Sequence, residues 1–449
     1  MRNIILLAVI LFVTVPIFLS GQTQFNSEWT APVLSPVSFA DSIPKKDCEQ
    51  KDFGDLFRML FPKKKKAEKN KVPRSEKKMN MLILPKISYN PANGLMLGIS
   101  ANSGLFLGSR DNTRLSFVGL TLAVTTLKQF ISFIKSNLYT AENKFFLQGD
   151  WRYYKYSEST YGLGTNSPDT SLKIDPSWGW DGAEVGDGVG YPMRYDYVIF
   201  HENANVKVFD NFYLGVGYQL DYYWNIKDEK LNLNTIPGQI TPHWAYSKTH
   251  GFDTASYMLS GVSLNVMYDS RDNQINAYKG YYARVNYRMN PTFLGSSENS
   301  TELWVEFRTY IGLSRKMPRH LIAFWFYGNF QITGTQPYLT LMALGDDQNA
   351  RSGRGYTAGR FRGQDYVYGE VEYRFPLMKC AQTLGGVIFV NASSASNRDR
   401  NVHLFDYVQP AFGFGIRILV NKHIRMNLDI DFGFGIRSKG VYLGGTEVF

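Results

Sequence analysis

Side chains that could carry out catalysis or bind a metal are few and scattered in this sequence. No two of its six histidines have the spacing of a metal-ligand pair, and no phosphate-binding loop is present. The one concentration of strongly polar side chains is a loop with four arginines, Arg351, Arg354, Arg360 and Arg362. By residue type these arginines are typical of an ordinary solvated loop. The sequence therefore predicts neither an enzyme nor a cofactor.

The composition combines many aromatic residues with a low mean hydropathy. Aromatic residues make up 15% of the 449 residues, charged residues 20%, and the mean hydropathy is −0.25. A helical membrane protein would need several apolar runs of about 20 residues, and only the N-terminus has one long apolar run. A membrane β-barrel reconciles these facts, because each of its strands presents only every second side chain to lipid.

Alternation with a period of two dominates the sequence after residue 80. Residues 424–436, for example, place seven apolar side chains on one face and Arg, Asn, Asp and Gly on the other, which is a strand pattern and not a helical one. Sixteen segments of this kind are near the length of about 9–11 residues that a tilted strand needs to cross a bilayer. They are 82–90, 94–107, 113–125, 128–140, 144–156, 194–208, 211–223, 257–269, 280–290, 301–313, 320–332, 366–376, 383–391, 408–420, 423–436 and 440–449.

The longest connections between these segments are all odd-numbered in chain order: 157–193, 224–256, 333–365 and 392–407. Even-numbered connections such as 108–112, 141–143, 209–210, 314–319 and 421–422 are short. An outer-membrane barrel has long outer loops and short periplasmic turns. The expected fold is therefore a 16-stranded antiparallel transmembrane β-barrel in the bacterial outer membrane, with both termini periplasmic. A soluble sandwich or propeller would also alternate, but its outward face would be polar.

The chain divides into three parts by composition. Residues 1–21 are expected to be a signal peptide, with a membrane anchor as the alternative, and residues 81–449 the barrel. Residues 22–80 are expected to be a flexible periplasmic segment whose stretch 63–78 has a net charge of +7. Anionic lipid or plain solvation suits this charge better than nucleic acid, since an exported protein meets none. Apolar residues between Phe53 and Phe61 have the spacing of one short amphipathic helix.

Three motifs, in this order beside sixteen strands, make residues 81–449 resemble the barrel domain of the BamA/TamA family, also called the bacterial surface-antigen family. The first is a strand–turn motif with Asp269, Arg271 and Asp272 before Lys279 and Gly280. The second, in the sixth outer loop, comprises Arg354, Gly355 and Tyr356, followed by Arg360, Phe361 and Gly363. The third is the strand sequence from Glu372 to Pro376.

The resemblance implies that the sixth outer loop folds back into the lumen. Its Arg354 would then pair with Glu372 on the inner wall, since a guanidinium in a partly dry lumen favours a bidentate carboxylate partner. Asn391 stands where the family usually has a second acid, so we expect a clasp that is one charge weaker. Phe449 resembles the terminal aromatic residue that marks outer-membrane proteins for insertion, and we expect it on the same face as Val441 and Leu443.

The family likeness suggests protein translocation or outer-membrane assembly as the function. Residues 22–80 show no pattern of the family's periplasmic modules, so we expect the membrane domain to work without them. The alternatives are a passive pore or a surface-exposed structural barrel. The expected partners are outer-membrane lipid and a periplasmic or client protein, with the barrel itself a monomer.

The two cysteines generate a prediction that gel mobility can test. Cys48 lies in the segment before the barrel and Cys380 in an expected periplasmic turn, so both would meet an oxidising compartment. A disulfide between them would hold the segment under the barrel. We expect the oxidised protein to shift on non-reducing electrophoresis and the Cys48→Ser variant to lack that shift; identical mobility of the two proteins would exclude the disulfide.

Overall fold

The computed structural model describes residues 50–55, 79–90, 94–167, 190–234, 239–348, 351–378 and 381–449. The expected signal peptide, most of the expected basic segment and both cysteines lie outside these residues. All of the strands belong to one unit, residues 51–449.

Sixteen strands form one antiparallel sheet in which each strand pairs with its neighbours in sequence. This order confirms the predicted fold class, and each predicted segment corresponds to one strand. The strands are β1 (Met79–Asn90), β2 (Gly94–Leu105), β3 (Ser116–Thr125), β4 (Phe130–Tyr139), β5 (Phe145–Thr160), β6 (Tyr191–Phe209), β7 (Phe212–Asp228), β8 (Tyr257–Asp269), β9 (Gly280–Asn290), β10 (Ser300–Gly312), β11 (Leu321–Gly334), β12 (Asp365–Pro376), β13 (Leu384–Ala395), β14 (Gln409–Asn421), β15 (Met426–Gly435) and β16 (Ser438–Gly444).

The two faces of the sheet have opposite chemistry, as strand β7 illustrates. Its Val216 is 61% exposed, whereas Gln219 is 5% exposed and Asp221 is also buried. Strand β14 repeats this arrangement, with Phe414 exposed and Arg417 buried. Apolar side chains therefore point outward and polar ones inward, which is the reverse of a soluble protein and is typical of a barrel wall in lipid.

Long and short connections lie at opposite ends of the strands. We call one end the long-loop rim, with the connections 161–190, 229–256, 335–364 and 396–408, and the other the short-turn rim. The connection 229–256 contains helix α3 (Pro242–His250), which the strand alternation does not predict. Thr241 caps this helix by accepting a hydrogen bond from the Trp244 amide, and Gly251 ends it with a φ of 75°. The described part of the chain contains no helix long and apolar enough to cross a membrane.

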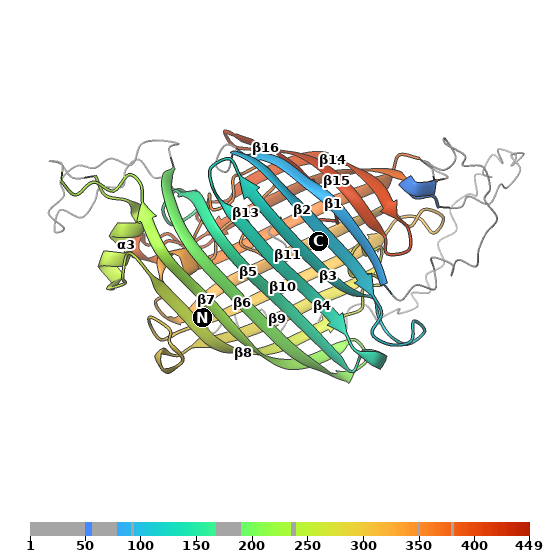
Figure 1. Ribbon diagram of the computed structural model, residues 1–449, viewed down its shortest axis with the longest axis horizontal. Helices are drawn as coiled ribbons and strands as arrows, with labels where there is room; N and C mark the ends of the chain where they lie inside the picture. Colours follow the sequence, from blue (N-terminus) through green and yellow to red (C-terminus); the bar gives the residue numbers. More distant parts are fainter. Residues whose placement is uncertain are drawn as a thin grey trace, which may run out of the picture. The chain divides into compact units, whose positions relative to one another are not determined.

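The sheet curls so that turns far apart in the sequence meet inside it. At the short-turn rim, Arg425 before β15 forms an ion pair of 2.7 Å with Asp272 in the β8–β9 turn. In the same place Ile275 packs against Ile424, and Leu115 before β3 packs on the same cluster. The near wall in Figure 1 contains the blue to green strands, and the yellow to orange strands lie behind it. Among the described residues no backbone ladder joins β16 to β1.

Residues 51–55 contact the short-turn rim. The Lys51 amide donates to the Ala381 carbonyl at 2.9 Å, and Asp55 forms an ion pair of 3.0 Å with Lys422. Asp52 and Asp55 accept each other's backbone amides, which is the hydrogen bonding of a capping box at a helix start. This agrees with the beginning of the predicted amphipathic helix, whose remainder lies outside the described residues.

A charged side chain introduced on the outward face tests whether that face of the sheet contacts lipid. We expect Val216→Arg on β7 to lower the free energy of unfolding by about 2–4 kcal/mol in lipid, because the guanidinium would face acyl chains. The matched control is Gln148→Arg on β5, since Gln148 lines an internal cavity. Urea titration in lipid vesicles measures both, and equal losses would contradict the assigned faces.

Candidate functional site

The β11–β12 loop (335–364) runs inside the sheet. Its residues Leu344, Tyr356 and Phe361 are buried in a cluster with Trp325 and Tyr368, which belong to the inner wall. The loop also contacts itself, because the Leu344 amide donates to the Phe361 carbonyl at 2.9 Å. Two passes of the loop therefore lie against strands β11 and β12, in the position that the family resemblance implies.

Glycines allow the tip of this loop to approach the wall closely. Gly353 and Gly355 have φ values of 81° and 117°, which L-residues rarely adopt. A Cβ atom on Gly355 would lie 2.7 Å from the Ala411 Cβ on β14. On β15, a Cβ on Gly433 would lie 2.5 Å from the Gly355 amide nitrogen. The backbone of the tip therefore fits only against a glycine-lined strip of wall.

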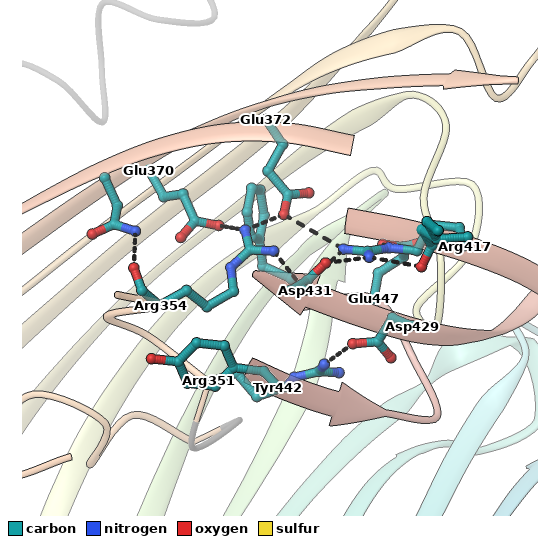
Figure 2. Close-up of polar contacts among 12 residues, drawn as sticks. Arg351, Arg354, Glu370, Glu372, Arg417, Asp429, Asp431, Tyr442 and Glu447 are labelled. Atoms are coloured by element: carbon teal, nitrogen blue, oxygen red, sulfur yellow. Dashed lines mark hydrogen bonds and ion pairs between the residues drawn. The ribbon is translucent and has the colours of Figure 1, made fainter. Parts of the chain in front are cut away.

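Between the two glycines, Arg354 reaches three carboxylates, an arrangement we call the arginine clasp (Figure 2). Its Nη1 donates to Asp431 on β15 at 2.6 Å, and its Nη2 donates to Glu370 and Glu372 on β12. All four side chains are at most 2% exposed. The Arg354 guanidinium also lies 3.6 Å from the centre of the Phe389 ring.

The clasp keeps Arg354 charged. Burial disfavours the guanidinium ion, but the carboxylates of Glu370, Glu372 and Asp431 outweigh it and raise the pKa of Arg354 well above its ordinary value. Three buried carboxylates around one cation would be costly by themselves. Neighbouring arginines supply the missing charge: Arg417 contacts Asp431 at 2.5 Å, and Arg374 contacts Glu372 at 2.6 Å.

Asn391 does not weaken the clasp in the way predicted. The expectation of one missing charge is wrong, because Glu370 and Asp431 both bind Arg354 in addition to Glu372. Asn391 instead donates from Nδ2 to the Arg354 carbonyl at 3.0 Å. An amide is suited to this role because it can donate a hydrogen bond, which a carboxylate cannot. Asn391 therefore holds the backbone of the tip while acids from two strands hold the side chain.

Tyr356 and Tyr442 connect the loop tip to the last strands. The Tyr442 hydroxyl on β16 accepts from the Gly355 amide at 2.9 Å and donates to the Tyr356 carbonyl at 3.0 Å. The Tyr356 hydroxyl donates to the Pro410 carbonyl and accepts from the Ile436 amide, at 2.8 and 2.9 Å. The tip thus contacts strands β14, β15 and β16 as well as β12.

The remaining loop-motif residues serve the fold of the loop. Phe361 packs edge-on against Tyr356, with ring centres 5.0 Å apart, and Arg360 lies over the Phe361 ring at 4.8 Å. A Cβ on Gly363 would lie 2.4 Å from the Ser396 carbonyl oxygen, so the chain needs glycine there. Arg362, in the same stretch of the loop, is buried and donates to Glu158 on β5 at 3.2 Å. It thereby fixes the loop to the opposite wall.

The strand–turn motif lies apart from the clasp, at the short-turn rim. Asp269 accepts from Arg271 at 2.9 and 3.0 Å and from the Tyr139 hydroxyl at 2.9 Å. Asp272 accepts from the Lys279 amide at 3.3 Å and pairs with Arg425. Gly280 has a φ of 104°, and a Cβ there would lie 2.4 Å from the Ser270 carbonyl oxygen. These contacts tie the β8–β9 turn across the interior.

The prediction for the end of the chain is wrong in one respect. Strand β16 ends at Gly444 and does not continue to residue 449. Val441 and Leu443 are exposed as expected, but Phe449 is 5% exposed and lies in the interior. Glu447 is the reason, since a carboxylate on the lipid side would be costly and inside it pairs with Arg417 at 2.8 Å. The role of Phe449 as an insertion signal stays a prediction.

Sequence reasoning missed several residues of this network. Glu370 alternates in phase with Glu372, and Asp429 and Asp431 lie on the polar face of residues 424–436. Alternation therefore places them inside, but it cannot show that strands β12 and β15 face one another around the loop. The residues that the motifs did not include are Glu370, Arg417, Asp429, Asp431, Tyr442 and Glu447.

A comparison with models of protein families gives one match, in the second half of the chain. Residues 223–441 match the Omp85 superfamily domain. This part of the barrel resembles the Omp85 superfamily domain. This confirms the recognition of a BamA/TamA-type barrel and assigns the chain, at a coarse level, to the outer-membrane proteins of translocation and assembly. The Omp85 match begins near the end of β7 and includes the clasp residues from Arg354 to Asp431.

The solved structures that the chain matches include a BamA and a CdiB protein. BamA from Haemophilus ducreyi lacking POTRA domains 1–3 is 14% identical, with a TM-score of 0.48 over 82% of this chain and 69% of that one. CdiB from Acinetobacter baumannii is 13% identical, with a TM-score of 0.46 over 83% and 60% of the two chains. A search of curated protein sequences found no match.

Removing the central guanidinium tests the clasp. We expect Arg354→Ala to lower the free energy of unfolding by about 3–5 kcal/mol, because it leaves buried carboxylates without their cation. Heat-modifiable mobility and urea midpoints in detergent measure the loss. Arg360→Ala is the control in the same loop, since Arg360 donates to a backbone carbonyl and covers an aromatic ring. If both variants are as stable as the wild type, the clasp does not hold the fold.

Proposed function

We propose that this chain is an outer-membrane translocation or assembly barrel whose lumen is closed at rest by the β11–β12 loop. In this proposal the long-loop rim faces the outside and both termini are periplasmic. The observation that carries it is the arginine clasp, which fixes the loop inside the barrel through acids on two strands. A loop held by buried ion pairs is a stable obstruction, since breaking one such pair is costly.

A passive pore fits this interior poorly. Near the long-loop rim, Tyr246 of α3 packs against Tyr338 of the β11–β12 loop with ring centres 5.6 Å apart. Below them is the clasp, and at the short-turn rim the Asp272–Arg425 pair connects turns from opposite walls. An internal cavity of about 380 Å³ is lined by the loop and by residues of β1, β2, β4 to β7 and β9 to β11. Side chains therefore cross the interior near the long-loop rim, at the clasp and at the short-turn rim.

The seam between the ends of the sheet supports an assembly role. Strand β16 has only seven residues and pairs with β15 alone among the described strands. A strand with one unpaired edge presents free backbone amides and carbonyls that another strand can bind. We therefore propose that a client segment pairs at this seam while lipid surrounds the outer face. The expected partners are a client or periplasmic protein, and we expect the barrel to be a monomer.

Conductance distinguishes a closed barrel from an open pore. We expect small, flickering currents from the wild type in planar bilayers, because the loop obstructs the lumen. Arg354→Ala should give larger and longer openings, while Arg360→Ala should resemble the wild type. A large, steady wild-type current that Arg354→Ala leaves unchanged would contradict the proposal and favour a passive pore.

A further inference from the structure

The last five residues leave the wall and enter the interior. None of residues 445–449 belongs to a strand, and Gly444 and Gly445 lie where the chain turns inward. Val448 is fully buried and Phe449 is 5% exposed, both within the largest buried cluster. We call residues 445–449 the tail. It fills a site on the inner wall as a bound peptide would.

An aromatic subsite surrounds Phe449. Its ring stacks on Trp325 of β11, with centres 5.2 Å apart and planes at 30°. Tyr310 of β10 borders the same ring at 6.2 Å. Arg374 of β12 lies over it at 5.1 Å and donates to the Phe449 carbonyl at 3.2 Å. The subsite thus recognises an aromatic side chain through its faces and a backbone carbonyl through a guanidinium.

A cationic subsite surrounds Glu447. Its carboxylate accepts from Arg417 of β14 at 2.8 Å and from Asn427 of β15, and Arg374 lies 3.9 Å away. The side chains at 447 and 449 are two residues apart, so in extended chain they project to the same side. The two subsites together fit an extended segment with an acid followed two positions later by an aromatic residue.

Charge balance depends on the tail. Glu447 joins the ion-pair network around the clasp by pairing with Arg417 at 2.8 Å, and Arg374 lies 3.9 Å from its carboxylate. Both arginines are buried, and their other acid partners, Asp431 and Glu372, also bind Arg354. If Glu447 leaves, Arg417 and Arg374 keep only acids that they share with Arg354, which is costly in a buried site. The site therefore favours an occupant with a carboxylate.

The attachment of the tail is suited to exchange. It hangs from the short strand β16 by two glycines, and glycine adds backbone freedom. Its backbone is bound by side chains, since Arg351 donates to the Thr446 carbonyl at 2.7 Å and Arg374 to that of Phe449. A tethered occupant competes at an effective concentration of roughly millimolar order. Only a segment of matching chemistry would displace it.

We infer that this pocket is a binding site for an acidic–apolar–aromatic peptide segment and that the tail occupies it in cis. The inference rests on the proposed function, because a client polypeptide would supply the competing segment. Displacement would exchange one carboxylate for another at Arg417 and one aromatic ring for another at Trp325. The tail thus keeps the site closed to ligands that lack either group.

Peptide binding to a tail-deleted barrel tests this inference. The probe is a fluorescein-labelled peptide with the sequence of residues 444–449, measured by anisotropy in detergent micelles. We expect the variant lacking 445–449 to bind it at least tenfold more tightly than the full chain does. Peptides with Gln for the acid, or Ala for the aromatic residue, should bind the variant at least tenfold more weakly than the probe.

A full-length variant covers the case in which deletion prevents folding. Glu447→Gln combined with Phe449→Ala keeps the chain length but weakens the tail, so it should also bind the probe better than the wild type. Heat-modifiable mobility shows whether each variant is folded. No binding to a folded variant, equal binding of the altered peptides, or failure of both variants to fold would overturn the inference.

This assay is independent of the proposed function. A barrel with small, flickering conductance that does not bind the probe would lose the peptide site and keep its role as a closed barrel. A barrel with a large, steady conductance that still binds the probe would keep the site and lose the proposed translocation or assembly role.

Discussion

The structure depends on neutralising charge inside a membrane-embedded wall. Strands that present apolar side chains to lipid must turn their polar side chains inward, where a hydrated but crowded interior cannot solvate each one separately. In the interior of the barrel, Arg354 neutralises buried acids by forming ion pairs with Glu370, Glu372 and Asp431. Because Arg354 comes from the β11–β12 loop, the ion pairs that neutralise these acids also hold the loop inside the barrel.

Charge pairing also explains the course of residues 445–449. Glu447 enters the interior to reach Arg417, and Phe449 follows it onto Trp325. Tyr442 binds the loop tip by two hydrogen bonds, so β16, the loop and the tail share contacts. A displacement of any one of them would remove partners from the other two. Coupling of this kind would let an event at the seam reach the lumen.

Much of this architecture could be predicted because the period-two pattern is a direct consequence of a wall between lipid and water. It predicted all sixteen strands and the inward direction of Glu372, which is fully buried. It could not pair Arg354 with Asp431, because the two are far apart in sequence and meet only when the loop folds inward. The tail was mispredicted because Glu447 and Phe449 continue the alternation, whereas a carboxylate facing lipid is costly and Glu447 pairs with Arg417 inside. Helix α3 was missed because it lies in a loop, where no alternation between lipid-facing and inward-facing side chains is required.

Hydrogen–deuterium exchange of the loop tip tests the central claim most directly. In lipid nanodiscs, amides of residues 351–363 should exchange slowly in the wild type, because the tip is buried and its amides are bonded inside the barrel. In Arg354→Ala the same amides should exchange much faster, while those of β7 and β8 stay protected. Fast exchange of the wild-type tip, or equal protection in both proteins, would contradict a loop held in the lumen by the arginine clasp.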